Sequence, residues 1–449
     1  MNRRKVGATA VLALWASMAV AQSAQMQVSL AQAQALAMKS NASAQISDLE
    51  RQVAKATIWQ NIAIGLPQVN VAGSYTNNIE LPAQFIDFGG TGELTKLTFG
   101  TKYASAGNLS ASQLVFDGSY FVALLATKVV TETAELGYQK SLRDVKEQVA
   151  QAYHLAVVTE RNAQAVSANL ELTKKLLDET KALQKEGFLD ATDVDQLALV
   201  VGNLENSLDF LNNQKEVTQA LLKLQMGVPQ ATSLTLTDAL EALVLFTDAG
   251  NALLTQGFDP KNHIDYRTMA VNRQGAKLNM QNEWVSFLPK VSLAYGANAN
   301  YVSQTANVWD PNGTQAANFA FSSWGLNASM PLFTSGRRVA RVKQAQLKLQ
   351  ELDLLLANTE SMLTMQYKLA RAEYSFALNS YLSQKRNEAL AKSVRDRMYT
   401  KFKEGVASSQ EYTQAENQYQ QSVSAMLNAA NNVLNKRVAL EKLLAQDLQ

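Results

Sequence analysis

Few side chains in this 449-residue sequence could carry out chemistry. The chain has two histidines and no cysteine, which excludes disulfides, thiolate metal sites and cysteine nucleophiles. His154 falls within a long helical stretch, and His263 stands beside Asp265 near the midpoint. The two histidines lack the spacing of a metal-binding pair, and neither stands near an evident nucleophile. The sequence therefore predicts no enzyme, no catalytic residue, no cofactor and no bound metal.

A glycine-rich segment is the other candidate for chemistry. Residues 88–92 read Phe-Gly-Gly-Thr-Gly, but no helix start with Lys-Ser or Lys-Thr follows, as a phosphate-binding loop requires. We expect the tip of an extracellular loop here, and another at residues 310–313. Because 41 Lys and Arg residues nearly balance 39 Asp and Glu, the chain also lacks the excess positive charge of a nucleic acid-binding protein.

The N-terminus has the pattern of an export signal. Arg3, Arg4 and Lys5 precede an apolar run at 6–20, and small residues at 19–21 form a cleavage pattern. An uncleaved membrane anchor is the alternative, but the run is shorter than the about 20 apolar residues that a spanning helix needs. No later segment resembles a membrane helix, so strands would have to make any further membrane span.

The rest of the chain repeats once, at an offset of about 218 residues. At the first landmark a helical pattern ends at a proline and an alternating pattern begins. At the second, the alternation stops and a long stretch poor in Gly and Pro starts. At the third, Lys-Glu-Gly interrupts that stretch. The landmarks pair 65–71 with 287–293, 114–118 with 331–336, and 185–187 with 403–405. Each half thus reads helix, strand, loop, strand, long helix, turn, helix.

The long stretches have the spacing of coiled-coil helices. Residues 119–184 contain no proline and would reach about 100 Å as one helix. Apolar and small residues recur there at three-four spacing, as in a narrow seam, and the same spacing returns within 194–222 and 412–443. Taken alone, this periodicity also fits a solid antiparallel bundle or a filament.

Four alternating segments favour a membrane sheet over a bundle. They lie at about 69–76, 105–116, 291–301 and 323–332, with apolar or aromatic residues on one side and small polar residues on the other. A strand of a membrane barrel shows this pattern. A soluble half-buried sheet alternates likewise, but the export signal argues against a cytosolic sheet.

Four such strands cannot close into a barrel. An open edge in lipid leaves backbone groups unsatisfied at several kcal/mol each, and the smallest known membrane barrels have about eight strands. Two copies would give eight strands with no usable lumen. Three copies would give twelve strands around a channel, with the helices continuing as a tube.

Together these features resemble the TolC family of outer-membrane efflux and secretion channels. The resemblance rests on the junctions at Pro67 and Pro289, the turn at 331–336 and the two glycine-centred hairpin tips, and it covers about Val28 to Leu444. It implies an α+β, mainly α, fold: a homotrimer with a twelve-stranded barrel in outer-membrane lipid and a long periplasmic α-helical barrel. Many members carry an acylated N-terminal cysteine, so this chain resembles the unlipidated branch.

The resemblance divides the chain into eight expected segments. They are the signal peptide 1–21, a periplasmic helix 22–67, β-hairpin 68–117, helical hairpin 118–230 with its tip near 187, an equatorial segment 231–262, a helix 263–289, β-hairpin 290–334, and helical hairpin 335–449 with its tip near 405.

The resemblance also implies two sites at the tips. The first is a docking surface for a periplasmic membrane-fusion adaptor, where glycine lets the backbone turn and small side chains permit close contact. Its residues are Gly187, Phe188, Leu189, Ala191, Thr192, Gly405, Val406, Ala407, Ser408 and Ser409. Tight turns without docking are the alternative.

The second implied site is a charged gate at the periplasmic mouth. Family members carry carboxylates six and nine residues after the second tip glycine. Here Glu411 keeps the first position and Gln414 replaces the second, while Asp193 stands at the corresponding first-half position. Carboxylates ringing an axis would stay charged only in a wet site. The alternative is an ordinary acid in the first turn of a helix, favoured by the macrodipole.

The implied function is a passive outer-membrane exit duct of a tripartite efflux system in a Gram-negative bacterium. Solutes would arrive from an inner-membrane transporter of the RND or ABC type through the adaptor. The outer-membrane component of a type I protein-secretion system is the alternative, and a structural coiled-coil stalk is a further one. A stalk needs the heptads but not two pairs of alternating strands.

Overall fold

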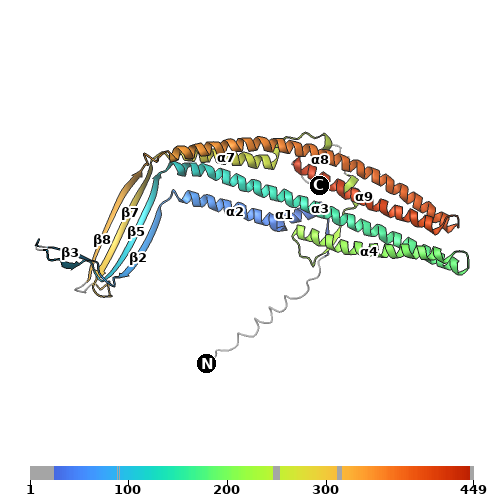
Figure 1. Ribbon diagram of the computed structural model, residues 1–449, viewed down its shortest axis with the longest axis horizontal. Coiled ribbons are helices and arrows are strands. Elements are labelled where there is room, and N and C mark those ends of the chain that lie inside the picture. Colours follow the sequence, from blue (N-terminus) through green and yellow to red (C-terminus); the bar gives the residue numbers. More distant parts are fainter. Residues whose placement is uncertain (1–24, 88, 91, 246–252, 311–315, 445–449) are drawn as a thin grey trace, which may run out of the picture. The chain divides into compact units, whose positions relative to one another are not determined.

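The computed structural model describes residues 25–87, 89–90, 92–245, 253–310 and 316–444, and Figure 1 shows its elements. The expected signal peptide, 1–21, lies outside these residues, as does most of the expected loop at 310–313. The first half contains β1 (Gln25–Val28), α1 (Leu30–Ser40), α2 (Ala42–Ala63), β2 (Gln68–Asn77), β3 (Ala83–Ile86), β4 (Thr95–Thr98), β5 (Tyr103–Phe116), α3 (Gly118–Lys185) and α4 (Ala191–Met226).

The second half repeats the long elements in the same order. It contains β6 (Ser233–Leu236), α5 (Leu240–Leu245), a short 3-10 helix (Pro260–Asn262), α7 (Ile264–Val285), β7 (Lys290–Ser303), β8 (Ala316–Ser329), α8 (Arg337–Lys403) and α9 (Ser409–Leu443). The chain divides into two compact units. One comprises 1–50, 135–267 and 358–449, and the other comprises 51–134 and 268–357.

The second of these units contains a four-stranded antiparallel sheet in the order β2-β5-β7-β8. Its register places Tyr295 opposite Trp324 and Leu293 opposite Leu326, so these apolar side chains share one face. The other face is polar, and there the Asn108 side chain donates a 2.5 Å hydrogen bond to Asn298. The strands expected from the alternation are therefore present, and they have the expected two-sided character.

Details of the strands differ from the sequence expectation. Strand β8 ends at Ser329, so Met330 and Leu332, which continue the alternation, lie beyond it. Its first half places Phe319 and Phe321 opposite Asn300 and Asn298, on the otherwise polar face. The loop between β2 and β5 contains a small hairpin, β3 with β4, that the sequence did not predict. Alternation does not show where a strand stops, because hydrogen-bonded partners decide it.

The first unit is held together by coiled-coil packing of the long helices. Ten residues of α3 at the expected three-four spacing are buried: Val145, Val149, Ala152, Ala156, Thr159, Ala163, Val166, Leu170, Thr173 and Leu177. The spacing predicted this core because residues three and four apart share one side of a helix. The structure shows no helix in the described residues that is long and apolar enough to cross a membrane.

The short strands of the first unit and the end of α4 form a small packed layer. Strand β1 pairs in parallel with β6, and Leu222 and Met226 at the end of α4 are completely buried. Gly227 ends α4 in the left-handed conformation, with φ of 71°. A Cβ atom at this position would lie 2.3 Å from the carbonyl oxygen of Ser40. Only glycine therefore fits at this end of α4.

We expect Gly227→Ala to lower the free energy of unfolding by roughly 2 kcal/mol or more, because it combines left-handed strain with a backbone clash. Gly137→Ala is the matched control. Gly137 lies within α3 and a Cβ atom there meets nothing within 4 Å, so this change is expected to be neutral or slightly stabilising. Thermal unfolding in detergent measures both variants. Equal stability of the two would contradict the close approach at Ser40.

Candidate functional site

The two hairpin tips of the first unit have the same backbone design. Gly187 ends α3 with φ of 79°, and Gly405 ends α8 with φ of 73°. At the first tip Phe188 N–H bonds the Leu183 carbonyl at 3.0 Å, and at the second Val406 N–H bonds the Lys401 carbonyl at 2.8 Å. These bonds satisfy carbonyls that the helix ends would leave free. The tips are thus tight, hydrogen-bonded turns whose glycines suit the left-handed backbone.

The tips carry exposed apolar side chains next to small ones. Phe188 is 76% exposed and Val406 is 72% exposed, and a Cβ atom on either tip glycine would meet nothing within 4 Å. Most of the residues expected to dock the adaptor are exposed or half-buried: Gly187, Phe188, Leu189, Ala191, Thr192, Gly405, Val406, Ala407 and Ser408. The tip surface is therefore open in the single chain.

Ser409 differs from the other residues expected to dock the adaptor. It is 2% exposed, and its hydroxyl lies 2.5 Å from Asp193 Oδ1 and 2.8 Å from Gln196 Oε1. One hydroxyl hydrogen serves one of these acceptors at a time. Ser409 therefore joins the two tips instead of presenting its side chain at the surface.

The expected gate residue Glu411 caps its own helix. Ser408 donates its N–H to Glu411 Oε2 at 2.8 Å, while Glu411 N–H donates to the Ser408 hydroxyl at 3.3 Å. This is a capping box. The hydrogen bonds from Ser408 hold the pKa of the Glu411 carboxyl below its usual range. The carboxylate therefore stays charged at neutral pH. The cap is stabilising above the unfolded pKa and is lost as pH falls through the folded one.

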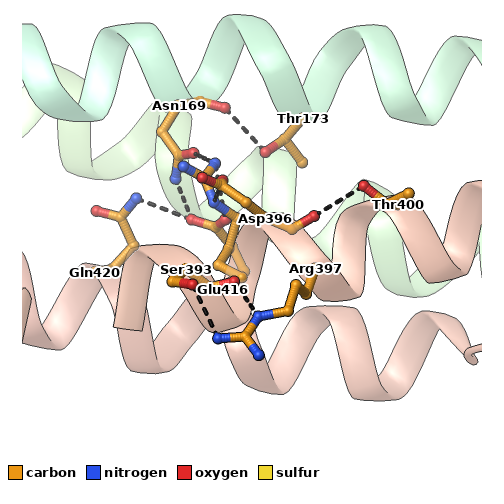
Figure 2. Close-up of polar contacts among 9 residues, drawn as sticks. Asn169, Thr173, Ser393, Asp396, Arg397, Thr400, Glu416 and Gln420 are labelled. Carbon is orange, nitrogen blue, oxygen red and sulfur yellow. Dashed lines mark hydrogen bonds and ion pairs between the residues drawn. The ribbon is translucent and has the colours of Figure 1, made fainter. Parts of the chain in front are cut away.

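A buried polar cluster, which the sequence did not reveal, lies farther along the hairpins (Figure 2). Arg395 of α8 is 6% exposed and Glu416 of α9 is 1% exposed. The Arg395 guanidinium donates to Asn169 Oδ1 at 2.9 Å, and Asn169 of α3 donates to Glu416. Gln420 donates to the same carboxylate at 2.9 Å. The cluster thus ties three helices together.

This cluster combines charge with aromatic packing. Arg395 Nη1 lies 3.8 Å from Glu416 Oε2, and Arg395 Nε lies 2.9 Å from Asp396 Oδ1. The guanidinium also sits 4.6 Å from the centre of the Tyr419 ring, a cation–π distance. In sequence, the only signal is that charged residues interrupt apolar heptads at 395 and 416, and spacing does not show which partner each meets.

The two histidines, which were the other candidates for chemistry, are both buried among packed side chains. Burial lowers the pKa of His154 to about 4, so this side chain is neutral in a packed core. Burial likewise lowers the pKa of His263, whose Nδ1 accepts the Asp265 N–H at 3.2 Å. In the described residues no group of three or more acidic or histidine side chains could hold a metal.

In the described part of the glycine-rich segment, the backbone amides do not form an anion-binding site. Its residues 88 and 91 lie outside the described part. The N–H groups of Gly89 and Gly92 donate to the Asp87 carboxylate at 3.1 and 2.9 Å. These amides therefore bind a side chain of the chain itself, in place of a phosphate.

Comparison with known proteins agrees with these observations. Residues 261–446 match the family model described as outer membrane efflux protein. The sequence has no significant match among curated proteins.

Several solved structures share the fold over nearly the whole chain. The outer membrane protein VceC of Vibrio cholerae is 16% identical, with a TM-score of 0.67 over 94% of this chain and 97% of VceC. The CmeC outer membrane channel of Campylobacter jejuni is 16% identical, with a TM-score of 0.68 over 92% of this chain and 85% of CmeC. The open-state MtrE channel of Neisseria gonorrhoeae is 15% identical, with a TM-score of 0.64 over 94% of this chain and 89% of MtrE.

These comparisons confirm the resemblance to the TolC family and, for the single chain, the expected fold class. The matched family is one of outer-membrane proteins, which agrees with the expected location. The matched family model is one of efflux proteins, and CmeC, which shares the fold, is itself described as a channel.

We expect Glu416→Ala to cost roughly 3 kcal/mol of unfolding free energy, because it removes a buried partner of Arg395 and leaves Asn169 and Gln420 donors unpaired. Glu416→Gln is the matched control, since its amide oxygen still accepts both hydrogen bonds, and a smaller loss is expected. Chemical unfolding in detergent measures both. A loss below about 1 kcal/mol for the alanine variant would show that the cluster does not hold the helices together.

Proposed function

We propose that this chain is the outer-membrane exit duct of a tripartite efflux system, working as a homotrimer. The observation that carries the proposal is the open four-stranded sheet, which is apolar on one face and mainly polar on the other. The remaining long elements of the chain are helical hairpins. The match of residues 261–446 to an efflux family supports the same function.

The open edges of the sheet support assembly into a trimer. Strands β2 and β8 each have one neighbour in the sheet, so each presents a row of unpaired backbone groups. In lipid every such group costs several kcal/mol, and closure against sister copies removes the cost. Three copies give twelve strands with lipid on the apolar face and a water-filled lumen on the polar face.

The helical hairpins would continue the channel into the periplasm. Helix α3 has 68 residues and α8 has 67, so each is about 100 Å long. The tips, with exposed Phe188 and Val406, are the surface we assign to a periplasmic membrane-fusion adaptor. An inner-membrane transporter of the RND or ABC type would deliver the solute and supply the energy. The duct itself conducts passively, and the buried histidines and the capped glycine-rich loop offer no coupling chemistry.

Outer-membrane fractionation tests the proposal directly. We expect the protein in the outer-membrane fraction, migrating as a trimer in detergent before heating and as a monomer afterwards. A monomer in mild detergent, or recovery only from the soluble periplasmic fraction, would overturn the exit duct.

Gly405→Trp tests the docking tip. The indole would project into open space, so we expect the trimer to form while adaptor binding and transport fall at least tenfold. Gly336→Trp is the matched control, since Gly336 also has positive φ, 78°, and nothing within 4 Å of a Cβ atom, but lies in the strand-to-helix turn. Adaptor pull-down and drug accumulation measure both. Equal transport by the two variants would count against docking at this tip.

Glu411→Gln tests the gate. Glutamine preserves the capping box, since it also serves at the third helical position, so the change removes only charge. If Glu411 faces the lumen as a ring of three carboxylates, conductance or cation sensitivity will change in single-channel recordings. Unchanged recordings would leave Glu411 as a helix cap alone.

A further inference from the structure

The first residues of α8 carry a cluster of basic side chains, which we call the basic patch. It consists of Arg337, Arg338, Arg341 and Lys343, and the chain has no acidic residue between Asp310 and Glu351. Three of its members, Arg337, Arg341 and Lys343, are exposed. In the described part of the chain none of the four side chains makes an ion pair. The patch therefore presents positive charge that the single chain does not compensate.

These basic side chains do not stabilise the helix that carries them. The N-terminal end of a helix has a partial positive charge, so acidic residues are favoured in its first turn and basic residues are disfavoured. Helix α8 has no acidic residue in its first turn. Arg337 and Arg341 stand four residues apart, so they share one face of the helix and repel each other. The reason for the patch therefore lies outside α8.

The internal repeat supplies a comparison at the same position. When Gly118 is aligned with Gly336, an offset of 218 residues, the four basic residues correspond to Ser119, Tyr120, Ala123 and Leu125. The first half nevertheless forms the same succession of strand, turn and long helix, from β5 to α3. This junction thus folds without basic residues, so the patch is not a requirement of the fold.

Exposed apolar side chains come directly before the basic patch. Strand β8 makes its last pairing at Ser329, opposite Lys290. Beyond it Leu332 and Phe333 are 89 and 86% exposed, and the patch begins four residues after Phe333, where α8 leaves the sheet (Figure 1). In the proposed duct, this change from apolar to basic surface marks the boundary between the hydrocarbon of the outer membrane and its periplasmic headgroups.

Neighbouring groups leave most of the patch available to a partner. Lys290 forms an ion pair with Asp117 at 2.9 Å, so these two charges compensate each other. The Arg338 guanidinium lies 5.4 Å from the centre of the Phe287 ring, a cation–π distance. Glu283 of α7 makes no ion pair with the patch within the described residues. The three exposed members of the patch are thus the charges that can meet an anion.

The height of the patch fits one layer of lipid headgroups. From Arg337 to Lys343 the helix rises by six residues, about 9 Å. The headgroup layer on each side of a bilayer is roughly 5–8 Å thick, and long basic side chains lay their stems along apolar surface while their charged ends reach the headgroups. A guanidinium group binds phosphate through two parallel hydrogen bonds. The phosphate of an anionic phospholipid therefore matches the patch in charge and in position.

We propose that the basic patch binds the headgroups of anionic phospholipids on the periplasmic side of the outer membrane. Arg337 and Arg341 would contact the phosphate, and Leu332 and Phe333 would contact the acyl chains. The proposal rests on the outer-membrane duct proposed above and adds its lipid partner. Each chain of the trimer would then have one such surface, which fixes the depth of the junction between sheet and helices in the bilayer.

Native mass spectrometry of the purified trimer in detergent tests the proposal by measuring the binding of phosphatidylglycerol. We expect Arg337→Gln/Arg341→Gln to raise the apparent Kd about 25-fold, because each basic residue near an anionic lipid surface contributes roughly fivefold. The matched control, Lys385→Gln/Arg386→Gln, removes two exposed charges farther along α8 and should leave the Kd unchanged. Arg337→Lys/Arg341→Lys keeps the charge and is expected to retain most of the binding.

Phosphatidylethanolamine and inorganic phosphate serve as comparison ligands. A preference for phosphatidylglycerol that only the glutamine variant of Arg337 and Arg341 loses supports the proposal. Equal binding of the two lipids by the natural protein, or an equal loss in the glutamine variant and its matched control, overturns it. Displacement of phosphatidylglycerol by inorganic phosphate also overturns it and assigns the patch to a soluble anion.

Single-channel recordings test the opposite orientation, in which the patch lines the lumen. Altered anion selectivity in Arg337→Gln/Arg341→Gln, with lipid binding unchanged, would overturn the proposal and leave the exit duct standing. A monomeric protein, or one absent from the outer membrane, overturns the duct and the lipid site together. If the double variant does not assemble, Arg341→Gln alone gives the same measurement, with an expected fivefold rise in Kd.

Discussion

The constraint on which the rest depends is the unpaired backbone at the two edges of the sheet. Strands β2 and β8 end a sheet of four, and a barrel in lipid cannot keep such edges. The apolar face that includes Tyr295, Trp324, Leu293 and Leu326 gives the sheet a surface suited to lipid, while Asn108 and Asn298 suit the other face to water. Four strands per chain satisfy lipid on one face only when sister chains supply the missing edges.

The long helices also present surface that the single chain does not cover, although they lie in water and not in lipid. Their buried seams are narrow and contain many small residues, such as Ala152, Ala156 and Ala163, so each helix covers little of its neighbour's surface. Large apolar side chains such as Phe210 of α4 and Leu390 of α8 remain exposed in the single chain. A tube wall needs each helix to contact neighbours on two sides, whereas a solid bundle buries one broad side. Exposed apolar side chains beside a buried seam would therefore suit a helix in the wall of the tube that we propose.

The tips combine stability and proposed function in the same few residues. Glu411 caps α9 through Ser408, and Asp193 accepts the hydroxyl that joins the two tips. Both carboxylates that the sequence assigned to a gate are thus also structural. For Glu411 the two roles are compatible, because the capping carboxylate keeps its charge and its side chain is exposed. Deeper in the hairpins, Arg395 and Glu416 hold three helices in one arrangement, which gives the tips a fixed base.

The sequence alone determined the repeat, the alternating strands, the seam of α3 and the tip glycines, because these follow from local periodicity and backbone conformation. It could not determine the end of β8 at Ser329, the β3–β4 hairpin or the contact of Ser409 with Asp193. It also missed the cluster of Asn169, Arg395 and Glu416. The Ser409 contact and the cluster depend on which segments meet across more than two hundred residues of chain, and the strand end and the hairpin depend on which backbone groups pair with a neighbouring strand. Spacing along one helix shows which residues share a face, and only the folded chain decides what that face touches.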